Sequence, residues 1–331
     1  MKKRLLTGDR PTGPLHLGHY VGSLQNRVKL QDEFDSFIMV ADVQALTDNF
    51  DNPKKVSDNT LQALLGNISA GLDPEKVTFF LQSAIPQIAE LTIFYANLVT
   101  TGRLERNPTV KDESKSKKNF NEGMPLGFFM YPVSQAADIT IVKAEIVPVG
   151  EDQVPHIEQT REIVRKFNSI YGNVFPEPTA KVGETGRLVG LDNNAKMSKS
   201  LGNAIFLNDN SQTVKQKIMG MYTDPSRIRA TDPVKVEGNP VFLYHDIFNT
   251  DLSEVEDLKS RYLKGQIGDV EVKTKLFNAV ERFLTPIRER RSQFEDHKKL
   301  MEILAVGTEH AQAVAKQTME EVKDVMGLVR V

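Results

Sequence analysis

The sequence predicts an α/β fold: a Rossmann-like, doubly wound parallel sheet followed by a helical C-terminal domain. In the first half, short apolar runs alternate with stretches of helical periodicity, which is typical of parallel sheets with helices on both faces. After residue 203 this alternation stops. The helices predicted there cover 211–221, 239–249, 252–264, 272–294 and 309–326.

The predicted strands are the apolar runs of the first half, at 5–6, 36–41, 77–81 and 146–149. The helices predicted between and after them start at Leu17 and cover about 53–71, 87–100, 134–139 and 154–168. The polar stretch 103–118 is interpreted as a solvated mobile loop. The alternative is that one or two of its cations reach a phosphate-bearing ligand.

The bulk composition indicates an ordinary globular protein of the cytoplasm. The chain has 331 residues, of which 40% are hydrophobic and 26% charged, enough for one large domain and a smaller one. It has no cysteine, which excludes disulfides and thiolate metal sites. The basic N-terminus runs into only two leucines, too few for a signal peptide, and no apolar run reaches the roughly 20 residues that span a membrane. With a net charge of −2, any nucleic-acid contact must come from a local patch.

The string 11–19, Pro-Thr-Gly-Pro-Leu-His-Leu-Gly-His, follows the first predicted strand and opens a helix. A strand, a Gly/Pro turn and a helix start make an anion site, because unpaired N–H groups point into the turn. His16 and His19 are three residues apart and can donate hydrogen bonds to phosphate, while Gly18 permits close approach of a nucleotide. The alternative is a turn with two solvated histidines.

A second motif, Lys-Met-Ser-Lys-Ser at 196–200, lies on a polar loop with Asn and Gly on either side. Two lysines that bracket a serine suit a closing clamp, which would neutralise the charge of a leaving pyrophosphate. Taken alone, such a loop is usually a solvated surface loop. The two motifs in this order resemble those of class I aminoacyl-tRNA synthetases.

Two further strings narrow the resemblance. Ala-Ala-Asp at 136–138 and Ile-Val-Pro-Val-Gly-Glu-Asp-Gln at 146–153 resemble the bacterial tryptophanyl-tRNA synthetase family, and the similarity runs along nearly the whole chain. The resemblance implies activation of tryptophan by ATP, with Mg²⁺ on its phosphates, release of pyrophosphate, and transfer of tryptophan to the 3′ end of tRNA(Trp). It also implies a cytoplasmic homodimer that binds neither membrane nor DNA.

The resemblance implies a tryptophan site around Asp138, whose carboxylate accepts the indole N–H. The other expected members are apolar walls at Leu6, Val147 and Val149, an aromatic wall at Tyr131, Gln153 at the ammonium group, and Gln44 and Gln135. Gln44 and Gln135 stand where many members have His and Met. The chain therefore resembles a divergent second type with a more polar pocket. The alternative for Asp138 is a carboxylate on the helix surface.

The catalytic residues implied are His16 and His19 at the phosphates, with Lys196, Ser198 and Lys199 clamping the pyrophosphate. The ATP site is expected to include in addition Arg10, Pro11, Thr12, Gly18, Gly150, Glu151, Asp152, Leu188, Met197 and Ser200. Gly150 to Asp152 would lie along the adenosine, with Leu188 near the base. No protein cage for the Mg²⁺ is expected.

The domains expected are a catalytic domain at 1–203, which includes the loop 192–203, and a helical anticodon-binding domain at 204–296. The segment 297–331 is expected to pack back on the catalytic domain. Basic residues of the helical domain are candidates for tRNA phosphate contacts, or else ordinary solvated helix faces. The alternatives are a small-molecule nucleotidylyltransferase, a tryptophan-binding regulator, and the tyrosine-specific branch of the synthetases.

Overall fold

The computed structural model describes residues 2–115, 123–183, 188–193, 197–198, 201–224 and 235–329. The chain forms two compact units. Unit 1 comprises Met1–Gly13, Gly22–Thr185 and Phe294–Val331, and unit 2 comprises Pro14–Val21 and Gly186–Gln293. The chain therefore passes between the units four times.

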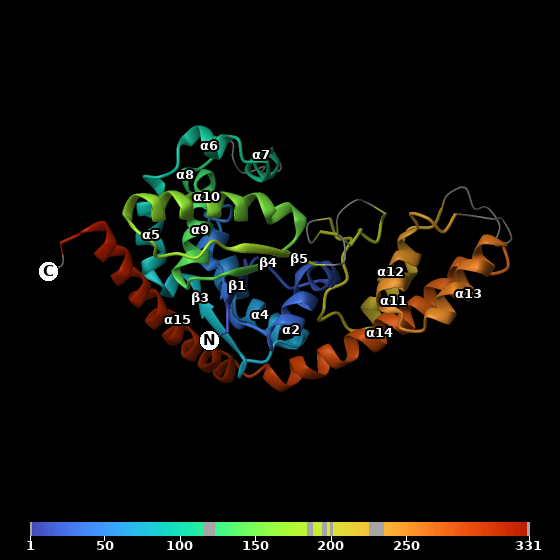
Figure 1. Cartoon of the computed structure of the whole chain (residues 1–331). Coiled ribbons are helices and arrows are strands. Elements are labelled where there is room, and N and C mark those ends of the chain that lie inside the picture. The colour runs from blue at the N-terminus through green and yellow to red at the C-terminus, as the bar shows by residue number, and fades with distance from the viewer. Residues whose placement is uncertain are drawn as a thin grey trace. The chain divides into compact units, whose positions relative to one another are not determined.

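Unit 1 contains the predicted parallel sheet. Its described strands are β1 (Arg4–Asp9), β2 (Asp35–Val40), β3 (Val77–Leu81), β4 (Ile146–Val149) and β5 (Thr179–Val182). They lie in the order β3-β2-β1-β4-β5, and all neighbours are parallel (Figure 1). The doubly wound fold is confirmed. The strand β5 was not predicted, because its four residues are partly or fully exposed and have no continuous apolar pattern.

Helices cover both faces of this sheet. The helices α5 (Pro86–Ala96), α9 (Tyr131–Ile141) and α10 (Val154–Tyr171) pack with Phe37, Met39 and Phe80 in one apolar cluster. The helix α4 (Pro53–Ala70) packs with Ile38, Val40 and Phe79 in the other. Successive strand residues point to opposite faces, so a continuous apolar run such as that of β2 supplies both clusters.

The ends of α4 show how the sequence sets helix boundaries. The Asn52 side chain accepts a hydrogen bond from the Lys55 N–H, and Pro53 occupies the first turn. At the other end Gly71 adopts a left-handed conformation with φ of 119°, which a residue with a side chain rarely tolerates. Both boundaries agree with the sequence prediction.

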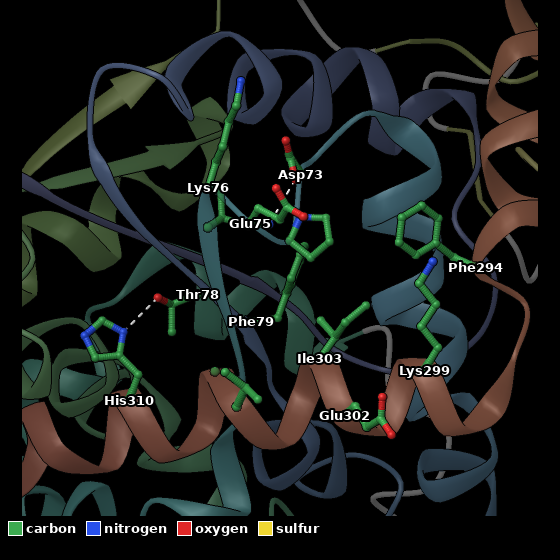
Figure 2. A pocket seen from close by; sticks show the side chains of 14 residues that line it. Asp73, Glu75, Lys76, Thr78, Phe79, Phe294, Lys299, Glu302, Ile303 and His310 are labelled. Carbon is green, nitrogen blue, oxygen red and sulfur yellow. Dashed lines mark hydrogen bonds between the residues drawn. The ribbon is translucent and has the colours of Figure 1, made fainter.

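The helix α15 (His297–Met326) runs along β3, the edge strand of the sheet. The Thr308 hydroxyl accepts a hydrogen bond from the Leu81 N–H at 3.1 Å, and His310 Nδ1 lies 3.0 Å from the Thr78 hydroxyl (Figure 2). A Cβ on Gly307 would lie 2.0 Å from the Phe79 carbonyl oxygen. The helix thus covers an edge that would otherwise expose unpaired backbone groups. It begins twelve residues before the predicted start at 309, because Asp296 caps its first turn.

The prediction of a loop at 103–118 was wrong for its described part. Residues 101–115 form α6 (Thr101–Glu105) and α7 (Pro108–Lys115). The Thr100 side chain caps α6, and buried Asn107 accepts hydrogen bonds from the backbone N–H groups of Thr109 and Val110. Arg103 forms an ion pair with Glu162 on α10. In each of these contacts a polar group bonds to the protein instead of to water. A polar sequence at 103–115 therefore does not by itself indicate a loop.

Shorter elements complete the described part of unit 1. They are α2 (Gln25–Leu30), α3 (Asp42–Leu46), η2 (Gln82–Ala84), α8 (Leu126–Phe129) and η3 (Glu151–Gln153). Before α2 the chain forms α1 (Leu17–His19) and the π-helical turn η1 (Tyr20–Leu24).

The described part of unit 2 is mainly helical, as predicted. Its helices are α1, α11 (Ser211–Met219), α12 (Pro240–Phe248), α13 (Leu252–Leu263) and α14 (Asp269–Phe294), whose last residue belongs to unit 1. Phe242 of α12 packs edge-on against Tyr262 of α13. The buried Lys273 ammonium donates to the carbonyl groups of Met219, the last residue of α11, and Met221. Across the described ranges, no helix combines the length and apolar character needed to span a membrane.

Candidate active site

In unit 2, backbone pairing fixes the start of the first motif. The Leu207 N–H donates to the Leu15 carbonyl at 2.9 Å, and the Leu17 N–H donates to the Ile205 carbonyl at 2.9 Å. His16 and Phe206 therefore form an antiparallel bridge. The first motif is thus anchored to residues that follow the second motif in the sequence.

The two histidines of the first motif lie against each other. Their ring centroids are 3.7 Å apart, and the His16 N–H donates to His19 Nδ1 at 3.1 Å. Because Nδ1 of His19 accepts this bond, the neutral ring carries its proton on Nε2. The His19 side chain is half-buried, and Nε2 is the ring nitrogen that can donate.

Gly18 and Met197 bring the two motifs into contact. The Gly18 N–H donates to Met197 Sδ at 3.2 Å. A Cβ on Gly18 would lie 3.0 Å from the His16 ring and 3.3 Å from Met197 Sδ, so a larger residue would displace one of them. Residues far apart in the sequence thus form one local structure.

The described part of the second motif is held by a polar network. The Ser198 N–H donates to Asn203 Oδ1 at 2.8 Å, and Asn203 Nδ2 donates to Asp192 Oδ1 at 2.8 Å. The Met197 N–H bonds to the carbonyl of Leu188, which is buried. Lys196, Lys199 and Ser200 lie outside the described residues.

In unit 1, a buried cation holds the C-terminal end of β1. Arg27 donates to both carboxylate oxygens of Asp9, at 2.6 and 3.1 Å, and to Asn67 Oδ1 at 3.0 Å. Beyond this end, Arg10 pairs with Asp48, and the Thr12 N–H bonds to the Arg10 carbonyl. Pro11 is buried and Thr12 is half-buried. Sequence patterns did not identify Arg27, which looks like one more cation of an amphipathic helix.

Residues 150–153 lie at the C-terminal end of β4, next to β1 in the sheet. The order of the strands reverses between β1 and β4, and ligands of doubly wound sheets bind at such points. A Cβ on Gly150 would lie 2.9 Å from Asp152 Oδ1, so a larger residue there would require the Asp152 side chain to move. Glu151 and Asp152 are exposed, and Gln153 Nε2 donates to Asp152 Oδ2 at 3.3 Å.

Asp138 is buried inside α9, with 2% of its surface exposed. This burial rules out the alternative of a carboxylate on the helix surface. Gln82 Nε2 donates to Asp138 Oδ1 at 2.8 Å. Burial raises the pKa of Asp138 to about 7, and the hydrogen bond from Gln82 opposes part of that increase. Gln82 was not identified from the sequence, because a glutamine after a strand has no distinguishing pattern.

The apolar residues predicted around Asp138 share one cluster. Leu6, Ala136, Ala137 and Val147 are buried in it, and Val149 packs against it. Gln135 and Gln44 are both half-buried, on α9 and α3. The Gln44 backbone N–H donates to Gln82 Oε1 at 2.9 Å.

Tyr131 belongs to a buried polar network that the sequence did not indicate. Its hydroxyl lies 3.0 Å from His156 Nε2, while Asn107 Nδ2 lies 3.3 Å from His156 Nδ1 and donates to Gln159 Oε1 at 2.9 Å. Backbone N–H groups at Thr109 and Val110 bond to Asn107 Oδ1, which leaves Nδ2 facing His156. Nδ1 of His156 therefore accepts, and its Nε2–H donates to Tyr131. Burial lowers the pKa of His156 to about 4, so the ring is neutral.

A separate pocket of about 530 Å³ lies in unit 1 between β3 and α15 (Figure 2). Phe79, Phe294 and Ile303 form part of its apolar wall, and Lys76 and Glu302 stand at its margin. None of the predicted site residues lines it. Within the described ranges, no group of three or more His, Cys, Asp or Glu side chains is arranged to hold a metal ion.

Comparison with known proteins identifies the family of the chain. The family model described as tRNA synthetases class I (W and Y) matches residues 1–285. A tryptophan–tRNA ligase of Clostridium longisporum is 54% identical over 99% of this chain and 97% of its own length. A tryptophan–tRNA ligase of Lactococcus lactis is 53% identical over 99% of this chain and 98% of its own length.

Solved structures agree in fold. Tryptophanyl-tRNA synthetase of Campylobacter jejuni, complexed with ADP and tryptophan, has a TM-score of 0.86 and 34% identity, covering 98% of this chain and 100% of that one. A tyrosyl-tRNA synthetase of Archaeoglobus fulgidus shares the fold, with a TM-score of 0.67 at 23% identity over 88% of this chain and 90% of that one. The family match, the full-length identities and the pairing of the two motifs lead to one conclusion: the chain belongs to the class I tRNA synthetases of the tryptophan and tyrosine family.

Proposed function

We propose that the chain activates L-tryptophan with ATP and then transfers it to tRNA(Trp). The tryptophan carboxylate attacks the α-phosphate, tryptophanyl-adenylate forms and pyrophosphate leaves. A ribose hydroxyl at the 3′ end of the tRNA then takes the tryptophanyl group, and AMP leaves. The full-length identity to tryptophan–tRNA ligases supports this reaction, so the chain is a tryptophan–tRNA ligase.

Tryptophan is selected by Asp138 in this proposal. The observation that carries it is the buried carboxylate, which lies among apolar residues and is held through one oxygen by Gln82. The indole N–H is the only donor in the tryptophan side chain. A ligand without it would leave the buried acceptor unpaired, which costs more than a missing methylene group. Leu6, Val147 and Val149 would form apolar walls around the ring system, and Tyr131 an aromatic one. Gln44 and Gln135 would make the pocket more polar, and Gln153 would hold the ammonium group.

The phosphates are assigned to the two motifs. His19 offers an Nε2–H donor beside His16, and Gly18 has no side chain to obstruct a nucleotide. Lys196, Ser198 and Lys199 would clamp the leaving pyrophosphate, with the two lysines neutralising its charge and Met197 and Ser200 beside them. Adenylate formation requires no protein nucleophile, so positioning and charge stabilisation supply the catalysis. ATP enters as its Mg²⁺ complex, with the ion held mainly by phosphate oxygens and water.

The adenosine is assigned to Arg10, Pro11, Thr12, Gly150, Glu151 and Asp152, with Leu188 near the base. The anion-binding turn and the end of β4 support these assignments, since both follow strands at the functional edge of a parallel sheet.

The residues 204–296 are proposed to bind the tRNA anticodon region. Several of their basic side chains pair within the unit: Arg261 with Asp257 and Glu271, Lys275 with Glu254, and Arg288 with Glu281. Because these cations are already paired with carboxylates, they would bind tRNA phosphates more weakly. Side chains at other positions would then contribute more to tRNA binding. The enzyme is further proposed to be a homodimer of the cytoplasm, by its similarity to the family.

ATP–pyrophosphate exchange tests this function. Exchange should depend on tryptophan and fall at least about a hundredfold with tyrosine, whose single ring fills a bicyclic site poorly. Exchange that prefers tyrosine would place the enzyme in the other branch of the family. Exchange without an amino acid would indicate a nucleotidylyltransferase, and tryptophan binding without exchange would indicate a regulator.

A further inference from the structure

Gln82 lies at a junction of three elements in unit 1. It is the first residue of η2, directly after β3, and only 2% of its surface is exposed. Its amide contacts the backbone of α3 and the carboxylate of Asp138 on α9. A buried amide with partners at both ends has one orientation, because each end satisfies a different kind of group.

The orientation of the Gln82 amide is set by backbone. The Gln44 N–H can only donate, so the Gln82 atom at 2.9 Å from it must be the carbonyl oxygen. The amide NH₂ group therefore faces Asp138, where it donates to Oδ1 at 2.8 Å. If the amide were turned over, its NH₂ group would face the Gln44 N–H and its oxygen would face the Asp138 carboxylate. Both contacts are unfavourable in a buried site.

We propose that Gln82 is a positioning residue for tryptophan specificity, which holds Asp138 through Oδ1 so that Oδ2 receives the indole N–H. This inference rests on the proposed role of Asp138 as the indole acceptor. The hydrogen bond also favours the ionised carboxylate, which accepts from an N–H more strongly than the protonated acid does. A protonated Asp138 would carry its proton on the oxygen that Gln82 does not hold, and that proton would meet the indole N–H.

The direct test compares Gln82→Met with the wild type in ATP–pyrophosphate exchange. Methionine has a similar length and fills the space, but it cannot donate to Asp138. Each enzyme is assayed with tryptophan and with its benzothiophene analogue, which lacks the ring N–H. The variant should lose on the order of tenfold in its preference for tryptophan, through a higher KM for tryptophan and an unchanged KM for ATP.

Gln31→Met is a matched control. Gln31 is also a buried glutamine of unit 1, with its amide bonded to the Val28 and Gly71 carbonyl groups and to the Asp73 N–H. Its loss should cost comparable stability and leave the preference between the two substrates unchanged. The comparison therefore separates an effect on Asp138 from the general loss of a buried amide.

A second variant, Gln82→Glu, keeps the length and the acceptor for the Gln44 N–H, and it covers the case in which Gln82→Met does not fold. A carboxyl group beside Asp138 raises the pKa of the pair, so the rise in tryptophan affinity with pH should move to higher pH. Gln82→Met adds no charge, so a shift of its own pH profile in the same direction reports the lost hydrogen bond, which a merely structural role would not cause.

Two results would overturn the proposal in different ways. A wild-type enzyme that treats both substrates alike would remove the role of Asp138, and with it that of Gln82. A wild-type enzyme that prefers tryptophan, with folded Gln82 variants that keep the same preference and pH profile, would reject Gln82 alone.

Discussion

In the proposed function, substrate selection depends on the carboxylate of Asp138, and the buried environment of this group couples selection to pH. Burial raises its pKa to about 7, so in the empty site the group is mostly protonated at pH 6 and mostly ionised at pH 8. Only the ionised form presents two acceptor oxygens to Gln82 and the indole. Tryptophan binding should therefore strengthen as pH rises through neutrality.

We expect the Kd of tryptophan to fall about tenfold between pH 6 and pH 8, because the fraction of enzyme with an ionised Asp138 rises by that factor. The chain contains no tryptophan, so the fluorescence of the ligand itself reports binding without tryptophan fluorescence from the protein. Asp138→Asn should show a flat profile over the same range. A wild-type Kd that is equal at both pH values would contradict the coupling.

Some site residues could be predicted from the sequence and others could not. Asp138, His16 and Gly18 could be proposed from local strings, because their neighbours carry the pattern. Gln82, Arg27 and His156 could not, since each acts through a partner distant in the sequence. Only the folded chain shows that a glutamine 56 positions before Asp138 holds its carboxylate.

At the scale of elements, the contact between α15 and β3 depends on one missing side chain. Gly307 lets the helix approach so closely that a Cβ would lie 2.0 Å from the Phe79 carbonyl oxygen. Leu300 and Leu304 of the same helix join one apolar cluster of the sheet, and Ala311 and Ala315 join the other. The helix thus crosses the edge of the sheet and closes both faces.

Gly307→Ala should destabilise the protein by about 3 kcal/mol, because the backbone of α15 must move away from β3. Urea denaturation followed by circular dichroism would show this as a lower midpoint. Gly127→Ala is the control: Gly127 lies on the helix α8, where an added Cβ would meet no atom within 4 Å, so a change within about 0.5 kcal/mol is expected. Equal midpoints for the two variants would show that α15 does not pack as described.

Elements with strong patterns were predictable, and those without were not. Buried strands such as β2 and β3 and capped helices such as α4 follow from local apolar runs, prolines and glycines. The strand β5 and the helices α6 and α7 have no such pattern. They form because tertiary contacts satisfy their polar groups, as Glu162 does for Arg103.

At the scale of the whole molecule, alternation of strand and helix predicted the doubly wound sheet and its helical C-terminal part. It did not predict that part of the first motif would belong to the other unit. Pro14–Val21 belongs to unit 2, where residue 15 bonds to residue 207 and residue 17 to residue 205. Pairings across nearly two hundred residues leave no local signal in a single sequence.

The measurement that tests the central account most directly is ATP–pyrophosphate exchange by Asp138 variants, with tryptophan and its benzothiophene analogue. Asp138→Ala should lose about 2 to 4 kcal/mol in kcat/KM for tryptophan, with little change for ATP, and should no longer separate the two substrates. Asp138→Asn should be milder, because its carbonyl still accepts a hydrogen bond. If Asp138→Ala discriminates between the two substrates as well as the wild type does, another residue recognises the indole N–H and the account is wrong.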